Sequence, residues 1–171
     1  MKIEFVKPTL EHKKEAMEFK KSFLDAGEKV INGSEMLDCM ESYEEWLAHI
    51  TMNASAETVN PDWVVTDTFF VLDKNRKIVG IVDFRHELKG FLVDFGHCGY
   101  SVRPEERNRG YATEILGDII KIAKEQGLDS INISVERSNV PSVKTIIKNG
   151  GKYKRSFEFQ GEFADVYEIS L

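Results

Sequence analysis

The stretch that most constrains the fold is residues 103–127, RPEERNRGYATEILGDIIKIAKEQG. Apolar residues recur at helical spacing from Tyr111 onward, so a long amphipathic helix is expected to end near Gly127. Its entrance carries Arg107, Arg109 and Gly110 rather than the usual cap and acidic residues. First-turn amides without intrahelical partners, together with the helix dipole, bind anions such as phosphate. The stretch therefore predicts a strand, an anion-binding turn and a helix in succession.

The rest of the chain alternates between strand and helix patterns. In the first helix, Leu10, Met17 and Leu24 share a stripe with Phe23 that is expected to face the core. A single crossover helix between two long strands implies parallel neighbours and a mixed α/β sheet in one domain, 1–171. The expected elements, in order, are a strand at 2–7, a helix from Pro8 to about Ala26, a helix at 42–50 opened by Ser42 and Glu45, a loop at 52–66, a hairpin of 68–73 and 78–86, a strand at 91–102, the helix of the opening stretch, a strand at 129–136, a helix at 140–149, and a closing hairpin of 152–159 and 163–171.

Charge and composition exclude several functions. A net charge of −6 argues against binding to nucleic acid or an anionic membrane, which needs a broad basic surface. Cys39 and Cys98 are too few for a disulfide scaffold or a structural zinc site, so no metal is expected. The sequence shows no signal-like start and no apolar run of about 18 residues, so a cytoplasmic location is expected.

Two spaced motifs resemble those of the GNAT acyl-CoA N-acyltransferases. The first is Arg107, Gly110 and Ala112, directly after the strand that ends in GYSVRP. The second is Asn139 followed three residues later by Ser142 at a helix start. The order of elements matches along nearly the whole chain, and the phrases FRHEL, GHCGY and RGYATEIL look like a bacterial branch of the family. The resemblance implies a central mixed sheet flanked by helices with a splayed parallel strand pair, and acetyl-CoA as acyl donor.

The resemblance also implies which residues bind the cofactor. The pantetheine arm would lie between the splayed strands and the pyrophosphate on the amides that open the 111–127 helix. Simpler interpretations stay open: the two arginines as a solvated pair, Asn139 as only a helix cap, and Thr113 as helix surface. The implied cofactor-binding residues are Tyr100, Ser101, Val102, Arg107, Asn108, Arg109, Gly110, Tyr111, Ala112, Thr113, Asn139 and Ser142.

The catalytic groups are less constrained. An acceptor amine with a pKa near 10.4 must lose a proton before it attacks, so a base is needed. Related N-terminal acetyltransferases often carry a carboxylate three residues before the tyrosine of the GY pair. His97 occupies that position here and is the first candidate, because a histidine has a suitable pKa. His86 is the second candidate, and Glu136 is also a candidate. A histidine satisfied inside the sheet is the alternative.

The family's usual acid is a tyrosine seven residues after the motif asparagine, where this chain has Ile146. Tyr100, Tyr111 and Tyr153 remain alternatives. Cys98 is expected to be core rather than an acylated nucleophile, so direct transfer is expected.

The acceptor is expected to be a primary amine of a small molecule or peptide. In this family the region between the first two strands usually walls the acceptor site. Here that region contains residues 34–47, which carry Glu35, Asp38, Glu41, Glu44 and Glu45 and no basic residue. Acids lining a cleft would attract a cationic amine, although a solvated helix face is an alternative. A non-catalytic acyl-CoA sensor and a nucleotide-phosphate binder are competing functions, and the resemblance also allows a homodimer.

Overall fold

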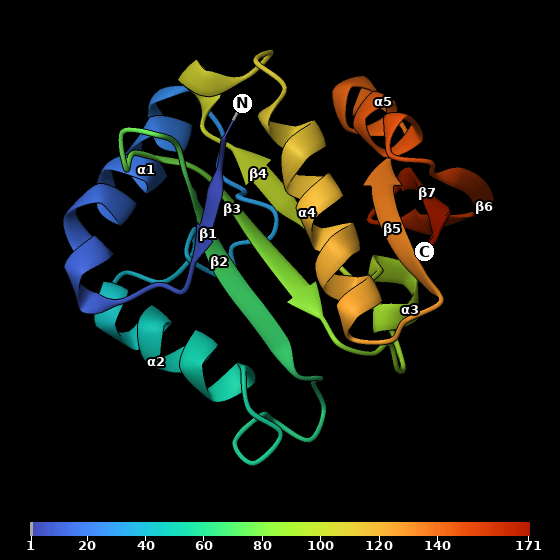
Figure 1. The fold of residues 1–171 in the computed structure, drawn as a ribbon, viewed down its shortest axis with the longest axis horizontal. Coiled ribbons are helices and arrows are strands. Elements are labelled where there is room, and N and C mark those ends of the chain that lie inside the picture. Colours follow the sequence, from blue (N-terminus) through green and yellow to red (C-terminus); the bar gives the residue numbers. More distant parts are fainter. Residues whose placement is uncertain (1) are drawn as a thin grey trace.

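The computed structural model describes residues 2–171 and folds into two antiparallel sheets flanked by helices (Figure 1). This confirms the α/β fold expected from the sequence. The first sheet has the order β1-β2-β3-β4 and the second has the order β5-β7-β6. The strands are β1 Glu4–Val6, β2 Thr66–Leu72, β3 Ile78–Arg85, β4 Tyr100–Val102, β5 Ser130–Glu136, β6 Lys152–Phe159 and β7 Glu162–Ser170.

Helices cover both faces of the first sheet because successive strand residues point to opposite sides. Phe70 and Ile81 pack in a cluster with Phe19 and Trp46 from the first two helices. Val71 and Val82, one residue further along each strand, join the cluster that contains the helix after β4. The helical elements are η1 Leu10–His12, α1 Lys13–Asp25, α2 Tyr43–Asn53, α3 Leu92–Phe95, η2 Pro104–Glu106, α4 Tyr111–Glu125 and α5 Val140–Lys148.

The buried face of α1 differs from the predicted stripe. Leu10 and Leu24 are 62% and 56% exposed, whereas Ala16, Phe19 and Phe23 are fully buried. Leu10 lies in the preceding 3₁₀ turn, whose tighter winding changes the phase of the side chains relative to α1. The prediction of a helix was confirmed, but the prediction of its core-facing residues was wrong except for Phe23 and the partly buried Met17.

The predicted long strand at 91–102 was also wrong in its first half. Residues Leu92–Phe95 form the short helix α3, and β4 contains only Tyr100–Val102. The expected parallel neighbours are absent from the strand pairs of residues 2–171, all of which are antiparallel. An isolated antiparallel bridge between Gly96 and Ile133 joins the two sheets instead. Because β4 and β5 belong to different sheets, the outer edge of β4 is left open.

Candidate functional site

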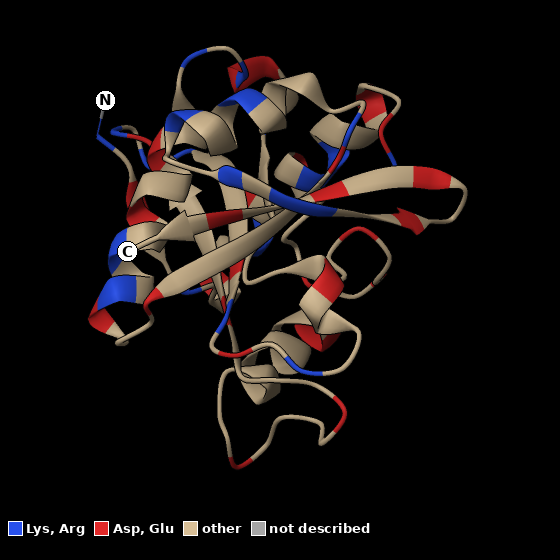
Figure 2. Ribbon diagram, turned by 90° about the vertical axis from the view of Figure 1, so that its right-hand side faces the viewer, with Lys and Arg blue, Asp and Glu red and all other residues tan. Residues whose placement is uncertain are grey.

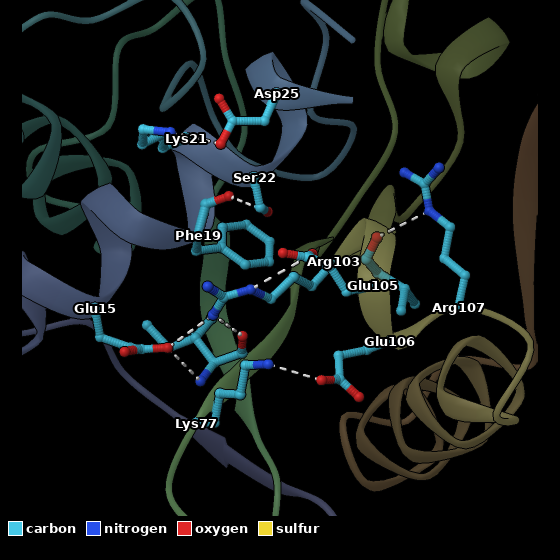
Figure 3. Close-up of polar contacts among 12 residues, drawn as sticks. Glu15, Phe19, Lys21, Ser22, Asp25, Lys77, Arg103, Glu105, Glu106 and Arg107 are labelled. Atoms are coloured by element: carbon cyan, nitrogen blue, oxygen red, sulfur yellow. Dashed lines mark hydrogen bonds and ion pairs between the residues drawn. The ribbon is translucent and has the colours of Figure 1, made fainter. Parts of the chain in front are cut away.

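The turn before α4 is held by a buried arginine. Arg103 is 8% exposed, and its Nη1 donates to Glu15 of α1 at 2.8 Å and to the Ile78 carbonyl at 3.3 Å. Lys77, directly before β3, donates to Glu106 at 2.7 Å, so η2 is fixed to the first sheet from two sides (Figure 3). These contacts fix the position at which α4 begins.

The start of α4 leaves its amides available. Asn108 and Gly110 have φ values of 61° and 88°, and Gly110, the N-cap residue, provides no side-chain cap. The first-turn amides, starting at Tyr111, have no intrahelical carbonyl to bond. They border a cavity of about 660 Å³, which we call the helix-mouth cavity. A helix N-terminus of this kind is suited to a phosphate or pyrophosphate.

Two further cavities continue from this one. The inter-sheet cavity, about 570 Å³, lies between β4 and β5 and shares Tyr100 and Ser142 with the helix-mouth cavity. The acidic cavity, about 460 Å³, lies between the α1–α2 segment and β3, and contains Glu35 and Asp83. Asn32 lines all three cavities. The structure therefore has a cleft made of three adjoining cavities that share lining residues.

The residues predicted to bind the cofactor are brought together. All of them except Arg109 line the helix-mouth cavity. The open edge of β4 contributes main-chain groups as well. Asp83 N donates to Gly99 O and Arg103 N donates to Val79 O, so by the antiparallel alternation the amides of Tyr100 and Val102 point away from β3 toward the cleft.

The two arginines of the motif are not free cations. Arg107 makes two hydrogen bonds to the carboxylate of Glu28, at 2.6 and 2.8 Å, and its Nε donates to the Val102 carbonyl at 3.2 Å. The Arg107 guanidinium lowers the pKa of Glu28. Arg109 donates to Glu106 at 2.6 Å and does not itself line the helix-mouth cavity. The charge pattern predicted an open basic turn, whereas the structure shows a turn neutralised by glutamates.

Asn139 caps α5 in the structure. Its Oδ1 accepts a hydrogen bond from Ser142 N at 3.3 Å, and the residue also lines both the helix-mouth and inter-sheet cavities. The cap role and the ligand role that the sequence left open are thus compatible. Capping uses the side-chain Oδ1, whereas a ligand would accept a hydrogen bond from the side-chain NH₂.

The tyrosine candidates differ in position. Tyr100 lines both the helix-mouth and inter-sheet cavities, and its buried hydroxyl lies beside the side chains of Ser142 and Thr145. Burial raises its pKa, so the phenol is neutral and able to donate. Tyr111 lines only the helix-mouth cavity, and Tyr153 is 59% exposed and bonded to Ser156. Ile146, where the family tyrosine is missing, is buried and borders the inter-sheet cavity.

Cys98 is a core residue at the wall of the inter-sheet cavity. It is 3% exposed and belongs to the main hydrophobic cluster. Burial raises the pKa of its thiol to about 12, so it carries no thiolate near neutral pH. This environment agrees with direct transfer rather than an acyl-cysteine.

The histidine candidates lie away from the cleft. His97 is 8% exposed, its Nδ1 accepts from Asn132 N at 2.9 Å, and its own amide donates to Asn132 O at 2.7 Å. Burial lowers its pKa. His86 faces Asp67, with Nε2 at 2.7 Å from Oδ2. Neither residue lines any of the three cavities. His97 is positioned to join the two sheets, and its acceptor nitrogen is already occupied.

Glu136 is the one predicted base at the cleft. It is exposed at the end of β5 and lines the inter-sheet cavity. Of the acids in residues 34–47, only Glu35 and Asp38 border a cavity, while Glu41, Glu44 and Glu45 are exposed on the surface. Both interpretations of that acidic stretch are therefore partly right.

Sequence reasoning did not single out the buried acid pair. The side chains of Glu35 and Asp83 are 6% and 3% exposed, and both face Arg85 Nη2, at 3.9 and 3.0 Å. Burial, followed by the charge of Asp83, raises the pKa of Glu35 to about 8. The acidic composition of residues 34–47 drew attention to Glu35. Its partner Asp83 lies 48 positions further along the chain (83 minus 35), so no local sequence pattern indicates the pair.

The sequence matches the acetyltransferase (GNAT) domain family over residues 9–152. This match spans most of the chain, and the protein therefore belongs to the GNAT acetyltransferase family, whose reaction is the transfer of an acetyl group from acetyl-CoA. No curated protein matches the sequence.

Solved structures share the fold at low sequence identity. The microcin self-immunity acetyltransferase MccE, solved with acetyl-CoA and AMP, has a TM-score of 0.73 at 14% identity, covering 99% of this chain and 92% of that one. A chimera of the spermidine N-acetyltransferase SpeG from Vibrio cholerae and hSSAT has a TM-score of 0.67 at 14% identity, covering 99% and 96%. The GNAT domain of PAT from S. lividans has a TM-score of 0.63 at 16% identity, covering 99% and 89%.

The surface charge is mixed rather than basic. Figure 2 shows Lys and Arg segments interspersed with Asp and Glu segments over most elements, and the β6–β7 hairpin projecting from the body. Among residues 2–171, no helix has the length and apolar character needed to span a membrane.

Proposed function

We propose that the protein is an acetyl-CoA-dependent N-acetyltransferase that acetylates a primary amine by direct transfer. The observation that carries the proposal is the continuous cleft. Its helix-mouth end offers uncapped amides for the pyrophosphate, and its middle runs along the open edge of β4. The amides of Tyr100 and Val102 would bind the pantetheine arm as an added strand and polarise the thioester carbonyl.

In the proposed reaction the amine nitrogen attacks the thioester carbonyl carbon while the carbon–sulfur bond breaks. The Tyr100 hydroxyl, buried beside Ser142 and Thr145, would give its proton to the departing CoA sulfur. A CoA thiolate resembles a cysteine thiolate, with a pKa of about 8.5, so it needs only modest assistance. The neutral amine requires a base, which is considered below.

The test combines binding and turnover. Calorimetry with acetyl-CoA and with a pantetheine fragment should show tighter binding of the full cofactor, because only it carries the pyrophosphate. Thiol release should then appear with at least one amine in a panel of polyamines, aminoglycosides, amino acids, amino-acid amides and short peptides.

A second function is an acyl-CoA sensor, which the isoleucine at 146 favours. Acetyl-CoA binding without thiol release on any acceptor would support it. ATP binding that CoA fails to displace would instead support a nucleotide-phosphate binder.

A further inference from the structure

The acidic cavity has the size and lining of a ligand site that cofactor binding leaves unused. Its volume of about 460 Å³ lies within the range of small-molecule pockets. Trp63 and Phe91, whose ring centroids are 5.8 Å apart, form an aromatic wall that Ile31 and Met36 extend. The charged lining consists of Glu35, Asp38, Asp62 and Asp83 against Arg85, with His49 as a further titratable group. This combination suits a cation with an apolar body.

Three polar atoms of the lining point to a ligand more directly. Ser34 Oγ, Trp63 Nε1 and Arg85 Nε are buried and have no hydrogen-bond partner among residues 2–171. Ser34 is only 1% exposed. Buried polar groups are normally paired, so these atoms are expected to bond to something that enters the cavity. Two of them can only donate, which calls for a hydrogen-bond acceptor on the ligand. The surrounding acids disfavour a carboxylate, so that acceptor is uncharged.

Glu35 is held in an unusual conformation at the base of this cavity. Its φ is 48° and that of Met36 is 75°, in the left-handed region that residues other than glycine rarely adopt. The Glu35 carboxylate receives a hydrogen bond from Asn53 Nδ2 at 3.2 Å and lies 3.9 Å from His49 Nε2. Strained backbone of this kind persists where surrounding structure enforces it, and it clusters at functional sites.

The acid pair connects the cavity to the open edge of β4. Asp83 accepts a hydrogen bond from Gly99 N at 2.6 Å, directly before β4, and from Arg85 at 3.0 Å. The Gly33 backbone packs against Gly99, and Gly33 lines both the acidic and inter-sheet cavities. An amine in the acidic cavity can therefore approach a thioester lying along β4.

We propose, given the acetyl transfer proposed above, that the acidic cavity binds the acceptor as a cationic amine with an apolar body and an uncharged hydrogen-bond acceptor, and that Glu35 takes up the proton of its ammonium group. The proton passes from nitrogen to the Glu35 carboxylate, directly or through one water. The freed lone pair forms the new carbon–nitrogen bond as the carbon–sulfur bond breaks. The Tyr100 hydroxyl protonates the departing CoA sulfur, the second nitrogen proton restores the Tyr100 hydroxyl, and Glu35 then releases its proton to solvent.

The electrostatics of the cavity agree with this role. Burial and the neighbouring Asp83 raise the pKa of Glu35 to about 8, while Arg85 and Asn53 oppose the shift. A base is most effective when its pKa lies near the working pH. Burial lowers the pKa of His49, the other titratable group facing Glu35 from α2, so His49 is neutral there.

The test uses thiol release with acetyl-CoA and three acceptors: L-phenylalanine amide, L-phenylalanine and spermidine. The amide has the apolar body, the amine and an uncharged acceptor, and its kcat/KM should exceed that of the other two by about ten-fold or more. Glu35→Gln should lower kcat by about 10²–10⁴-fold, and Glu41→Gln, an exposed acid of the same segment, is the matched control. The Kd for acetyl-CoA should be unchanged in both variants.

A pH profile separates Glu35 from the titration of the substrate. With O-benzylhydroxylamine, whose nitrogen is neutral across the range, Glu35 would take the proton that the nitrogen loses as the carbon–nitrogen bond forms. The wild-type rate should therefore still rise toward a plateau above pH 8, and Glu35→Gln should lack that rise. Near-normal kcat and an intact rise in a folded Glu35→Gln variant would overturn the role of Glu35. Preference for spermidine or free phenylalanine would overturn the assigned acceptor class. Failure of the wild-type protein to bind acetyl-CoA would instead overturn the proposed function on which this inference rests.

Discussion

Glu28 and Arg107 form a two-bond ion pair across the mouth of the cleft, joining residues 79 positions apart. Both residues line the helix-mouth cavity, so the carboxylate lies where the cofactor phosphates are expected. An incoming pyrophosphate competes with Glu28 for the same guanidinium. The pair therefore bears directly on cofactor affinity.

Glu28→Gln should strengthen acetyl-CoA binding, by up to about 5-fold, because the competing charge is removed from a partly exposed pair. Arg107→Gln should have the opposite effect. Calorimetry with acetyl-CoA measures both variants, and the pantetheine fragment is the control, since it lacks the phosphates. An equal gain for cofactor and fragment would show that Glu28 acts elsewhere.

Gly33→Ala should destabilise the protein by steric conflict. A Cβ at Gly33 would lie 2.1 Å from the Gly99 carbonyl oxygen, and φ is +73°. Gly27 has nearly the same φ, +78°, but open space around the added carbon. Gly27→Ala therefore isolates the conformational strain, and Gly33→Ala should cost about 1–3 kcal/mol more. Thermal or urea unfolding of the two variants compares these costs; equal losses would contradict the close packing.

Gly110→Val is a poor test of phosphate placement. A valine near a helix start ordinarily costs only about 0.5 kcal/mol of stability. Gly110 has a φ of 88°, however, where a β-branched residue is strained whether or not a ligand binds. We expect the variant to lose stability without acetyl-CoA present, as a thermal melt of the free protein would show.

Tyr100→Phe should lower kcat by about ten-fold or more if the phenol assists the leaving thiolate. The acetyl-CoA Kd should change little, because the ring remains as part of the cavity lining. Tyr153→Phe is the control, since that hydroxyl is exposed and bonds Ser156. Rapid-quench measurement of a single turnover reports the chemical step; an unchanged rate would transfer the role to solvent.

Glu35→Gln should change how stability depends on pH. The pKa of Glu35 is raised in the folded protein to about 8 from an ordinary 4.5, so the folded state holds a proton that the unfolded state releases between these values. Stability should therefore fall as pH rises through this window. Glu35→Gln should remove this slope and raise Tm at pH 8 relative to wild type, by about 2–4 °C for each kcal/mol gained. A wild-type-like slope in the variant, measured from pH 5 to 8, would contradict the buried pair.

His97→Asn should keep kcat within about ten-fold, below the loss typical of a removed general base, because His97 does not border the cleft. His97→Ala should reduce stability, since Asn132 N loses its acceptor. Burial lowers the pKa of His97, so below about pH 6.5 the unfolded state binds a proton that the folded state does not. The free energy of unfolding of the wild-type protein should therefore decrease as the pH falls below about 6.5. Both variants should lack that acid-side loss in thermal melts. A large fall in kcat for both, with stability unchanged, would restore His97 as the base.

The order of helices and strands was predictable because each element carries a local signal. The cap Ser42 accepts a hydrogen bond from Glu45 N, as its spacing predicted, and the hairpins follow their turn residues. The segment 91–95 was mistaken for strand because its apolar run carries no clear period. Its conformation depends on aromatic contacts of Phe95 with Phe157 and Phe159, which lie far along the chain.

The lining of the helix-mouth cavity was also predictable, since its residues belong to two continuous motifs. The lining of the acidic cavity was not. Glu35, Asp83 and Arg85 come from separate elements, and their significance depends on burial and mutual distance rather than spacing. For the same reason the net charge of the turn before α4 was misjudged, because Glu28 lies outside it.

The segment Asn32–Gly33 borders the inter-sheet and acidic cavities at once, proposed here for the thioester and the acceptor, and Ser101 Oγ holds it by donating to the Asn32 carbonyl at 2.9 Å. A shared wall makes the two ligands thermodynamically linked: whatever factor bound CoA applies to acceptor affinity, the acceptor applies to CoA. If one ligand positions Asn32–Gly33 and so completes the binding surface for the other, the two ligands would bind in a fixed order. The order of substrate addition, measured by steady-state kinetics, would then depend on two loop residues that take no part in the chemistry.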